Sequence, residues 1–149
     1  MKKTVKTGVS LLLTLLMIFS FAACGKKEDT QTKNQGKDDL WQNATYTENK
    51  EFGNGKTTVQ VEVKVGDRSV TFTVKTDKKT LGDALGEHNL IDGEKSEYGM
   101  YVKVVNGITA DYDKDKAFWS FCKNGEMMTT GIDSADIADG EHYEIIYSK

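Results

Sequence analysis

The segment "TVQVEVKVGDRSVTFTV", residues 58–74, decides the fold, because apolar and polar residues alternate along most of it. The apolar positions of its first half are Val59, Val61, Val63 and Val65. After Gly66-Asp67 the alternation resumes with Val70, Phe72 and Val74. A period of two is typical of strands with one buried face, and two such runs across a short glycine-containing loop predict an antiparallel hairpin.

The segment after this hairpin changes to a helical period. In "TLGDALGEHNL", residues 80–90, Leu81, Ala84 and Leu85 recur at helical spacing. We expect Thr80 to be the N-cap of this helix, with Asp83 as its partner three residues later.

Short extended runs follow at residues 100–105, 118–123 and 141–148. Asn106-Gly107 and Asn124-Gly125 end the first two runs, and Asn-Gly favours tight hairpin turns. The order hairpin, helix, strands predicts an α+β domain: a small, mixed, β-grasp-like sheet with one helix packed on it.

Residues 1–23 have the features of a secretory signal, with three lysines before an apolar run from Val9 to Ala23. Phe21-Ala22-Ala23-Cys24 is similar to a bacterial lipobox, in which the cysteine receives diacylglycerol and acyl chains such as palmitate. We expect Cys24 to be lipidated; the alternative is an ordinary signal peptidase site with an incidental cysteine. Lipidation would place the protein on the extracytoplasmic face of a bacterial cell membrane.

The remaining chain divides by composition. We predict that residues 24–45 are the lipidated cysteine and a flexible polar tether, and that residues 46–149 form one domain. Without residues 1–23 the chain has 17 basic and 23 acidic residues, a net charge of −6. Nucleic acid is therefore not expected as a partner, since there is no basic face to neutralise phosphates.

Sequence motifs of enzymes are missing. The histidines, His88 and His142, have no nucleophile near them in sequence, and there is no phosphate-binding glycine loop, G-x-S-x-G motif or paired-cysteine zinc motif. We expect a protein that is not an enzyme.

The acidic segment Asp111, Asp113 and Asp115 has the D-x-D-x-D opening of a calcium loop, so these residues are candidate ligands for a calcium-like cation. The glycine of such loops is replaced by Lys116, and Cys122 stands where a closing glutamate is expected. A solvated hairpin loop is the favoured interpretation. Asp133, Asp136 and Asp139 would add ligands only if the fold brings them close.

The aromatic run at residues 118–123 presents two faces if it is a strand: Trp119 and Phe121 on one, Phe118 and Cys122 on the other. One face belongs to the core, and a large aromatic left on the other would mark a binding surface. We expect Cys122 to pack as a small apolar side chain.

Residues 46–147 resemble a known family. The resemblance rests on this pattern: Gly99-x-Tyr101, Asn106-Gly107, Phe118-Trp119, Gly131-Ile132 and Asp139-Gly140. The segment is similar to the C-terminal β-domain of the vertebrate cobalamin carriers transcobalamin and intrinsic factor, and more so to the bacterial DUF4430 domains grouped with them. The resemblance implies a corrinoid ligand, faced by these residues: Trp119, Phe121, Tyr98, Met100, Tyr101, Met127 and Met128.

Two functions remain open. The favoured one is a non-catalytic cell-surface lipoprotein that binds a ligand, a corrinoid by resemblance, together with a transporter or a second binding domain. In the vertebrate carriers the corrinoid is held between this domain and a large helical domain, which has no counterpart in this sequence. One domain alone would bury less of the ligand's surface than the two together. The alternative is a cation-binding or adhesive surface domain.

Overall fold

The predicted hairpin is present as β2 (Thr57–Val65) and β3 (Arg68–Thr76), which pair antiparallel across the turn at Gly66. The computed structural model describes residues 39–149, so the predictions for the signal segment, Cys24 and the tether up to residue 38 lie outside the described residues. The last part of the predicted tether is not flexible but belongs to the domain: Trp41 is 3% exposed, and its Nε1 donates to the carbonyl of Val65 at 3.2 Å. Every second side chain of β2, from Val59 on, is buried, which confirms the alternation read from the sequence.

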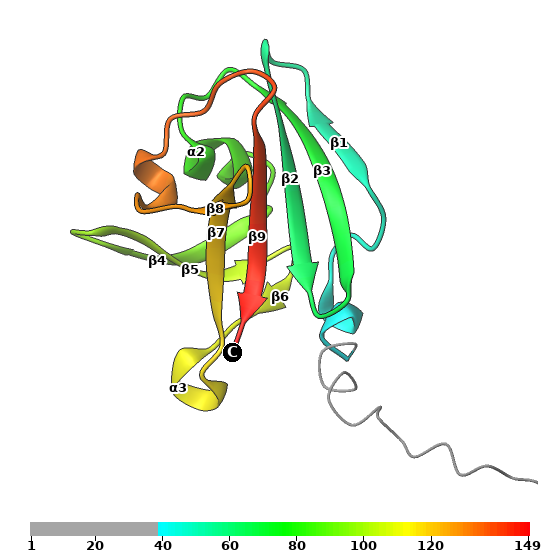
Figure 1. Ribbon diagram of the computed structural model, residues 1–149, viewed down its shortest axis with the longest axis vertical. Helices are drawn as coiled ribbons and strands as arrows, with labels where there is room; N and C mark the ends of the chain where they lie inside the picture. The colour runs from blue at the N-terminus through cyan, green and yellow to red at the C-terminus, as the bar shows by residue number, and fades with distance from the viewer. Residues whose placement is uncertain (1–38) are drawn as a thin grey trace, which may run out of the picture. The chain divides into compact units, whose positions relative to one another are not determined.

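A six-stranded sheet is built around this hairpin, in the order β1-β3-β2-β9-β7-β8 (Figure 1). The C-terminal strand β9 (His142–Ser148) is parallel to β2 and antiparallel to β7 (Phe118–Lys123). At the edges, β1 (Lys50–Gly53) is parallel to β3, and β8 (Glu126–Met127) is antiparallel to β7. The sheet is therefore mixed, as expected.

A second sheet was not expected from the sequence. It has three antiparallel strands, β4 (Ile91–Ser96), β5 (Gly99–Val105) and β6 (Ile108–Thr109). The β4–β5 hairpin projects away from the larger sheet in Figure 1. β5 contacts β7 by packing and forms no ladder with it, so a single sheet does not form.

The predicted helix is α2 (Leu81–Gly86), and the Oγ1 atom of its N-cap Thr80 accepts a hydrogen bond from the amide of Asp83 at 3.3 Å. α2 packs against β3, β4 and the 3-10 helix η2 (Ile132–Ser134). Within residues 39–149, no helix combines the length and the apolar character that crossing a membrane requires.

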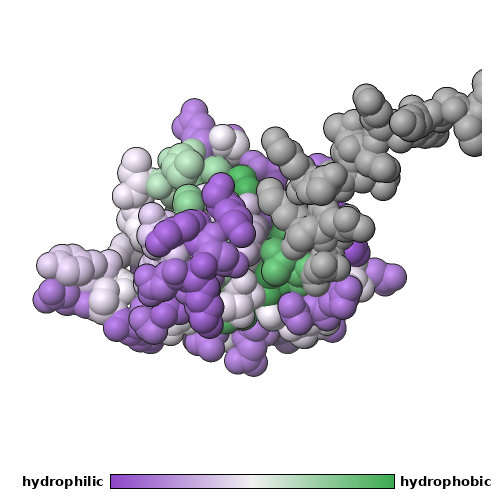
Figure 2. Space-filling model, turned by 90° about the horizontal axis from the view of Figure 1, so that it is seen from below, coloured by the Kyte–Doolittle hydropathy of each residue, from purple (hydrophilic) through white to green (hydrophobic). Residues whose placement is uncertain are grey.

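Two more short helices flank the sheets. They are the 3-10 helix η1 (Asp39–Asn43) and the one-turn helix α3 (Tyr112–Asp115). The face seen from the end that carries α3 is largely hydrophilic, with hydrophobic residues in small areas (Figure 2). The described chain is thus mostly β-sheet with short helices, a mixed α+β domain. Its more specific assignment as β-grasp-like stays a prediction.

Candidate functional site

A pocket of about 690 Å³ lies beside the β7–β8 hairpin, under the loop that leads through η2. This volume falls in the range of small-molecule sites. We call it the β7–β8 pocket. Its lining residues are Lys123, Asn124, Glu126, Met127, Met128, Thr129, Thr130, Ser134, Ala135, Asp136 and Tyr143.

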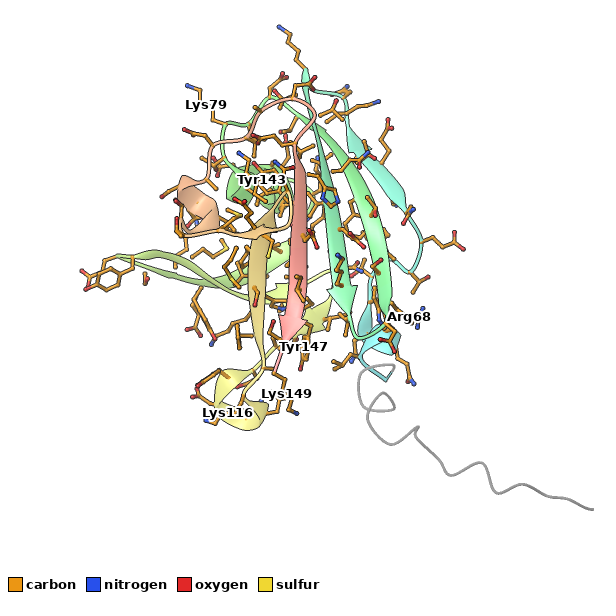
Figure 3. The ribbon with its side chains drawn as sticks, in the orientation of Figure 1. Arg68, Lys79, Lys116, Tyr143, Tyr147 and Lys149 are labelled. Atoms are coloured by element: carbon orange, nitrogen blue, oxygen red, sulfur yellow. The ribbon has the colours of Figure 1, made fainter. Side chains whose placement is uncertain are left out.

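Tyr143 of β9 is a buried residue of this lining, at the opposite end of its strand from Tyr147 (Figure 3). Its hydroxyl donates a hydrogen bond to Oε2 of Glu141 at 2.5 Å, and Oε1 of Glu141 lies 2.5 Å from Nζ of Lys123. The amide of Ala138 also donates to Glu141, at 2.9 Å. One carboxylate therefore ties together β7, β9 and the preceding loop.

This network shifts the pKa values of its members. Burial raises the pKa of Tyr143, and its hydrogen bond to Glu141 raises it further. Burial opposes ionisation of Glu141, but hydrogen bonds from Lys123, Tyr143 and Ala138 outweigh it, so the pKa of Glu141 is lowered.

Backbone pairing fixes the loop above the pocket. Thr80 and Asp136 form an antiparallel bridge, the amide of Leu81 donates to the carbonyl of Ala135, and the amide of Ile137 donates to Lys79. Thus the start of α2 holds this side of the pocket in place.

Two predicted ligand residues line the β7–β8 pocket. Met127 is 68% exposed, and Met128 is half-buried with its amide donating to the carbonyl of Phe121. Methionine side chains are flexible and polarisable, so they adapt to apolar ligand surfaces.

Three other predicted residues lie on the β4–β5 hairpin. Tyr98 at the turn is 91% exposed and Tyr101 is 46% exposed. Met100 is half-buried, and its amide donates to Oδ2 of Asp133 in η2 at 2.8 Å. This bond joins the hairpin to the loop that also lines the pocket. The predicted ligand residues are therefore split between the hairpin and the pocket.

Comparison with known proteins places this chain in a family. Residues 78–149 match the family described as a domain of unknown function, DUF4430. A protein of Ruminococcus gnavus ATCC 29149, provisionally described as metal binding, is similar in structure, with 35% identity and a TM-score of 0.60. The similarity covers 63% of this chain and 98% of that one. The chain belongs to the DUF4430 family.

Haptocorrin in complex with Cbi is also similar, with 20% identity and a TM-score of 0.54 over 66% of the DUF4430 chain. The matched part is only 26% of the haptocorrin chain, and at this identity the likeness concerns the fold. It supports the link to transcobalamin-like domains that the sequence indicated. No curated protein matches the sequence.

Trp119 of the DUF4430 chain is a core residue, which corrects the expectation that it faces a ligand. It is 6% exposed, its Nε1 donates to the carbonyl of Lys103 at 3.2 Å, and its ring packs edge to face on Tyr147. Phe121, on the same strand face, is half-buried against the core and is not among the residues that line the pocket. Strand alternation places both aromatics on the inner face of the sheet. The buried Cys122 confirms its expected packing.

The acidic segment forms α3 instead of the expected loop, and its carboxylates do not converge. Oδ1 of Asp111 caps α3 by accepting from the amides of Asp113 and Lys114, and Oδ2 pairs with Nζ of Lys114 at 3.2 Å. That hydrogen bond from Lys114 is the main reason why the pKa of Asp111 is lowered. Among residues 39–149, no group of three or more acidic, histidine or cysteine side chains is placed to hold a metal. As placed here, Asp111, Asp113 and Asp115 therefore do not form a site for a calcium-like ion.

Two of the other candidate aspartates, Asp133 and Asp139, also accept hydrogen bonds from the backbone. Asp133 accepts from Met100, and Asp139 accepts from the amide of Thr58 at 2.7 Å.

Sequence reasoning missed Lys123, Glu141 and Tyr143. Their only local signal was the Asn124-Gly125 turn. Lys123 lies 18 positions from Glu141 and 20 from Tyr143, whereas Glu141 and Tyr143 are only two positions apart.

Proposed function

We propose that this DUF4430 chain is a non-catalytic ligand-binding module, held on the extracytoplasmic face of a bacterial membrane by a lipid on Cys24. The observation that carries the proposal is the β7–β8 pocket, about 690 Å³ in volume, with Met127 and Met128 in its lining. The exposed Tyr98 and Tyr101 of the adjoining hairpin supply a second apolar surface. A planar, partly apolar ligand such as a corrinoid suits these two surfaces.

A partner is part of the proposal. The pocket and the hairpin are open to solvent on the side away from the core, whereas ligand sites bury most of a small molecule's surface. The chain matches 26% of haptocorrin, which supports the idea that a transporter or second domain covers the other side of the ligand.

Calorimetry of a soluble protein beginning at Gly25 tests ligand binding, with cobalamin as the titrant. We expect saturable heat that weakens at least severalfold in Met127→Ala and in Tyr98→Ala. Tyr112→Ala is the matched control, because Tyr112 is 52% exposed but lies on α3. A silent titration, with and without membrane extract as a source of partner, would reject the corrinoid.

The anchor needs its own test, since Cys24 lies outside the described residues. We expect the full-length protein to enter the membrane fraction with a mass increase from its lipid, and Cys24→Ser to abolish that increase. If Cys24→Ser still enters the membrane fraction and its mass differs from that of the wild-type protein only by the substitution itself, Cys24 is not lipidated.

Cation binding is the second candidate, supported by the 35% identical relative provisionally described as metal binding. An adhesive surface domain belongs to the same alternative. Saturable calcium binding beside a silent cobalamin titration would favour this candidate, and the acidic residues involved would then have to be rearranged from the positions described above.

A further inference from the structure

The β7–β8 pocket has three ionisable lining residues other than Tyr143: Lys123, Glu126 and Asp136. Whether each of these residues is already in an ion pair determines whether the pocket favours a cationic or an anionic ligand.

Lys123 is not available to an anionic ligand. Its Nζ is 2.5 Å from Oε1 of Glu141, whose side chain is 19% exposed and already accepts from Tyr143 and Ala138. Moving the ammonium group onto a ligand would leave a largely buried carboxylate without its counter-charge, which is costly. The positive charge at the pocket is thus neutralised internally.

Glu126 and Asp136 have no such compensation. Neither carboxylate has a basic partner among residues 39–149. Other acidic residues at the sheet surface have one: Glu144 pairs with Lys64, and Glu51 pairs with Lys75. Both residues are exposed at the pocket wall. The charges of Lys123 and Glu141 cancel, so Glu126 and Asp136 give the pocket a net charge of −2.

The rest of the lining is suited to an apolar body. Met127 and Met128 present thioethers, whereas the ring of Tyr143 is buried and has Nζ of Lys123 5.7 Å from its centroid. Methionine side chains are flexible and polarisable, so they adapt to the shape of an apolar group.

We infer that the β7–β8 pocket binds an organic cation, whose charge is balanced by Glu126 and Asp136 and whose apolar body packs against Met127 and Met128. This inference rests on the proposed function, because it names the ligand class of the same pocket.

A charge-matched pair of probes tests it. Phenethylammonium and 3-phenylpropanoate share an aromatic body but differ in charge, and either can be titrated while the amide signals of Met128 and Asp136 are followed by NMR. We expect the cation to bind at least about tenfold more tightly than the anion, and the difference to shrink in 0.5 M salt, since exposed charges are screened.

Variants locate the effect. Glu126→Gln with Asp136→Asn should weaken phenethylammonium binding about tenfold, as two charge interactions are lost. Asp113→Asn with Asp115→Asn removes the same charge from α3 and should leave binding unchanged.

Equal binding of both probes, binding of neither, or equal effects of the two double variants would overturn the inference. Cobalamin binding to the same protein decides the proposed function separately. Saturation by cobalamin without binding of either probe overturns only this inference, and binding of phenethylammonium beside a silent cobalamin titration overturns only the corrinoid.

Discussion

Gly82 of α2 and Asp133 of η2 approach so closely that a Cβ at position 82 would lie 2.6 Å from Oδ1 of Asp133. The other oxygen of the same carboxylate accepts the amide hydrogen of Met100 in β5. One side chain therefore joins the helix, the pocket loop and the exposed hairpin, and only glycine leaves room for it.

Gly82→Ala should destabilise the protein by about 1–3 kcal/mol, because the added methyl group overpacks this junction. Gly86→Ala is the matched control: no atom lies within 4 Å of its Cβ position. This second change should stabilise by about 0.4–1 kcal/mol through a more restricted unfolded chain. Urea unfolding of both variants measures the difference, and equal effects would show that the close approach is not maintained in solution.

Trp119→Ala should lower the free energy of unfolding by about 3–5 kcal/mol, as large aromatic truncations in cores do. Phe118→Ala, at the neighbouring 40% exposed position, should cost less than about 1 kcal/mol. Chemical denaturation compares the two. A Trp119→Ala protein of normal stability would restore the view that this side chain serves a ligand.

The Glu141 network should make stability depend on pH. The pKa of Glu141 is lower in the folded protein than its ordinary value of 4.5, so its ionised form stabilises the fold above that pH. This contribution is lost as the pH falls through the folded-state pKa. We expect wild type to be more stable than Glu141→Gln at pH 7 and the gap to narrow below pH 4.5.

Thermal unfolding at pH 7, 5 and 3 measures that gap. Glu48→Gln is a suitable control, since Glu48 is exposed and has no ion pair among the described residues. A gap that stays constant across this range would mean that the Lys123–Glu141 pair does not form.

Asp111→Ala should lower the Tm whether or not calcium is present, because Asp111 caps α3. Asp113→Asn, which keeps the cap, should leave the Tm nearly unchanged. A rise in Tm with calcium that disappears in both variants would instead identify this segment as a cation site.

The local elements could be predicted because their causes lie within a few residues. Alternation fixed β2 and β3, Thr80 capped α2, and the Asn-Gly pairs adopt the positive φ angles that their turns need, 50° for both Asn106 and Asn124. The segment at residues 111–115 was misjudged because a single aspartate can either bind a metal or cap a helix, and the sequence contains both patterns.

The site could be predicted only in part. Met127 and Met128 were found through the family resemblance, and they do line the pocket. Lys123, Glu141 and Tyr143 were not found, because the ion pair that joins Lys123 to Glu141 depends on which strands are neighbours. Periodicity gives the face of a residue but not the neighbour of its strand.

The sequence by itself thus determined the strands, the helix, the tight turns and the family, since these depend on side-chain period and local backbone conformation. Only the tertiary structure decided that Trp119 is core, that β4–β6 form a separate sheet, and that one carboxylate neutralises Lys123 at the pocket. The physical reason is that burial and charge pairing arise between segments far apart in the chain, and the pairing of β7 with β9 brings Trp119 to Tyr147 and Lys123 to the start of β9.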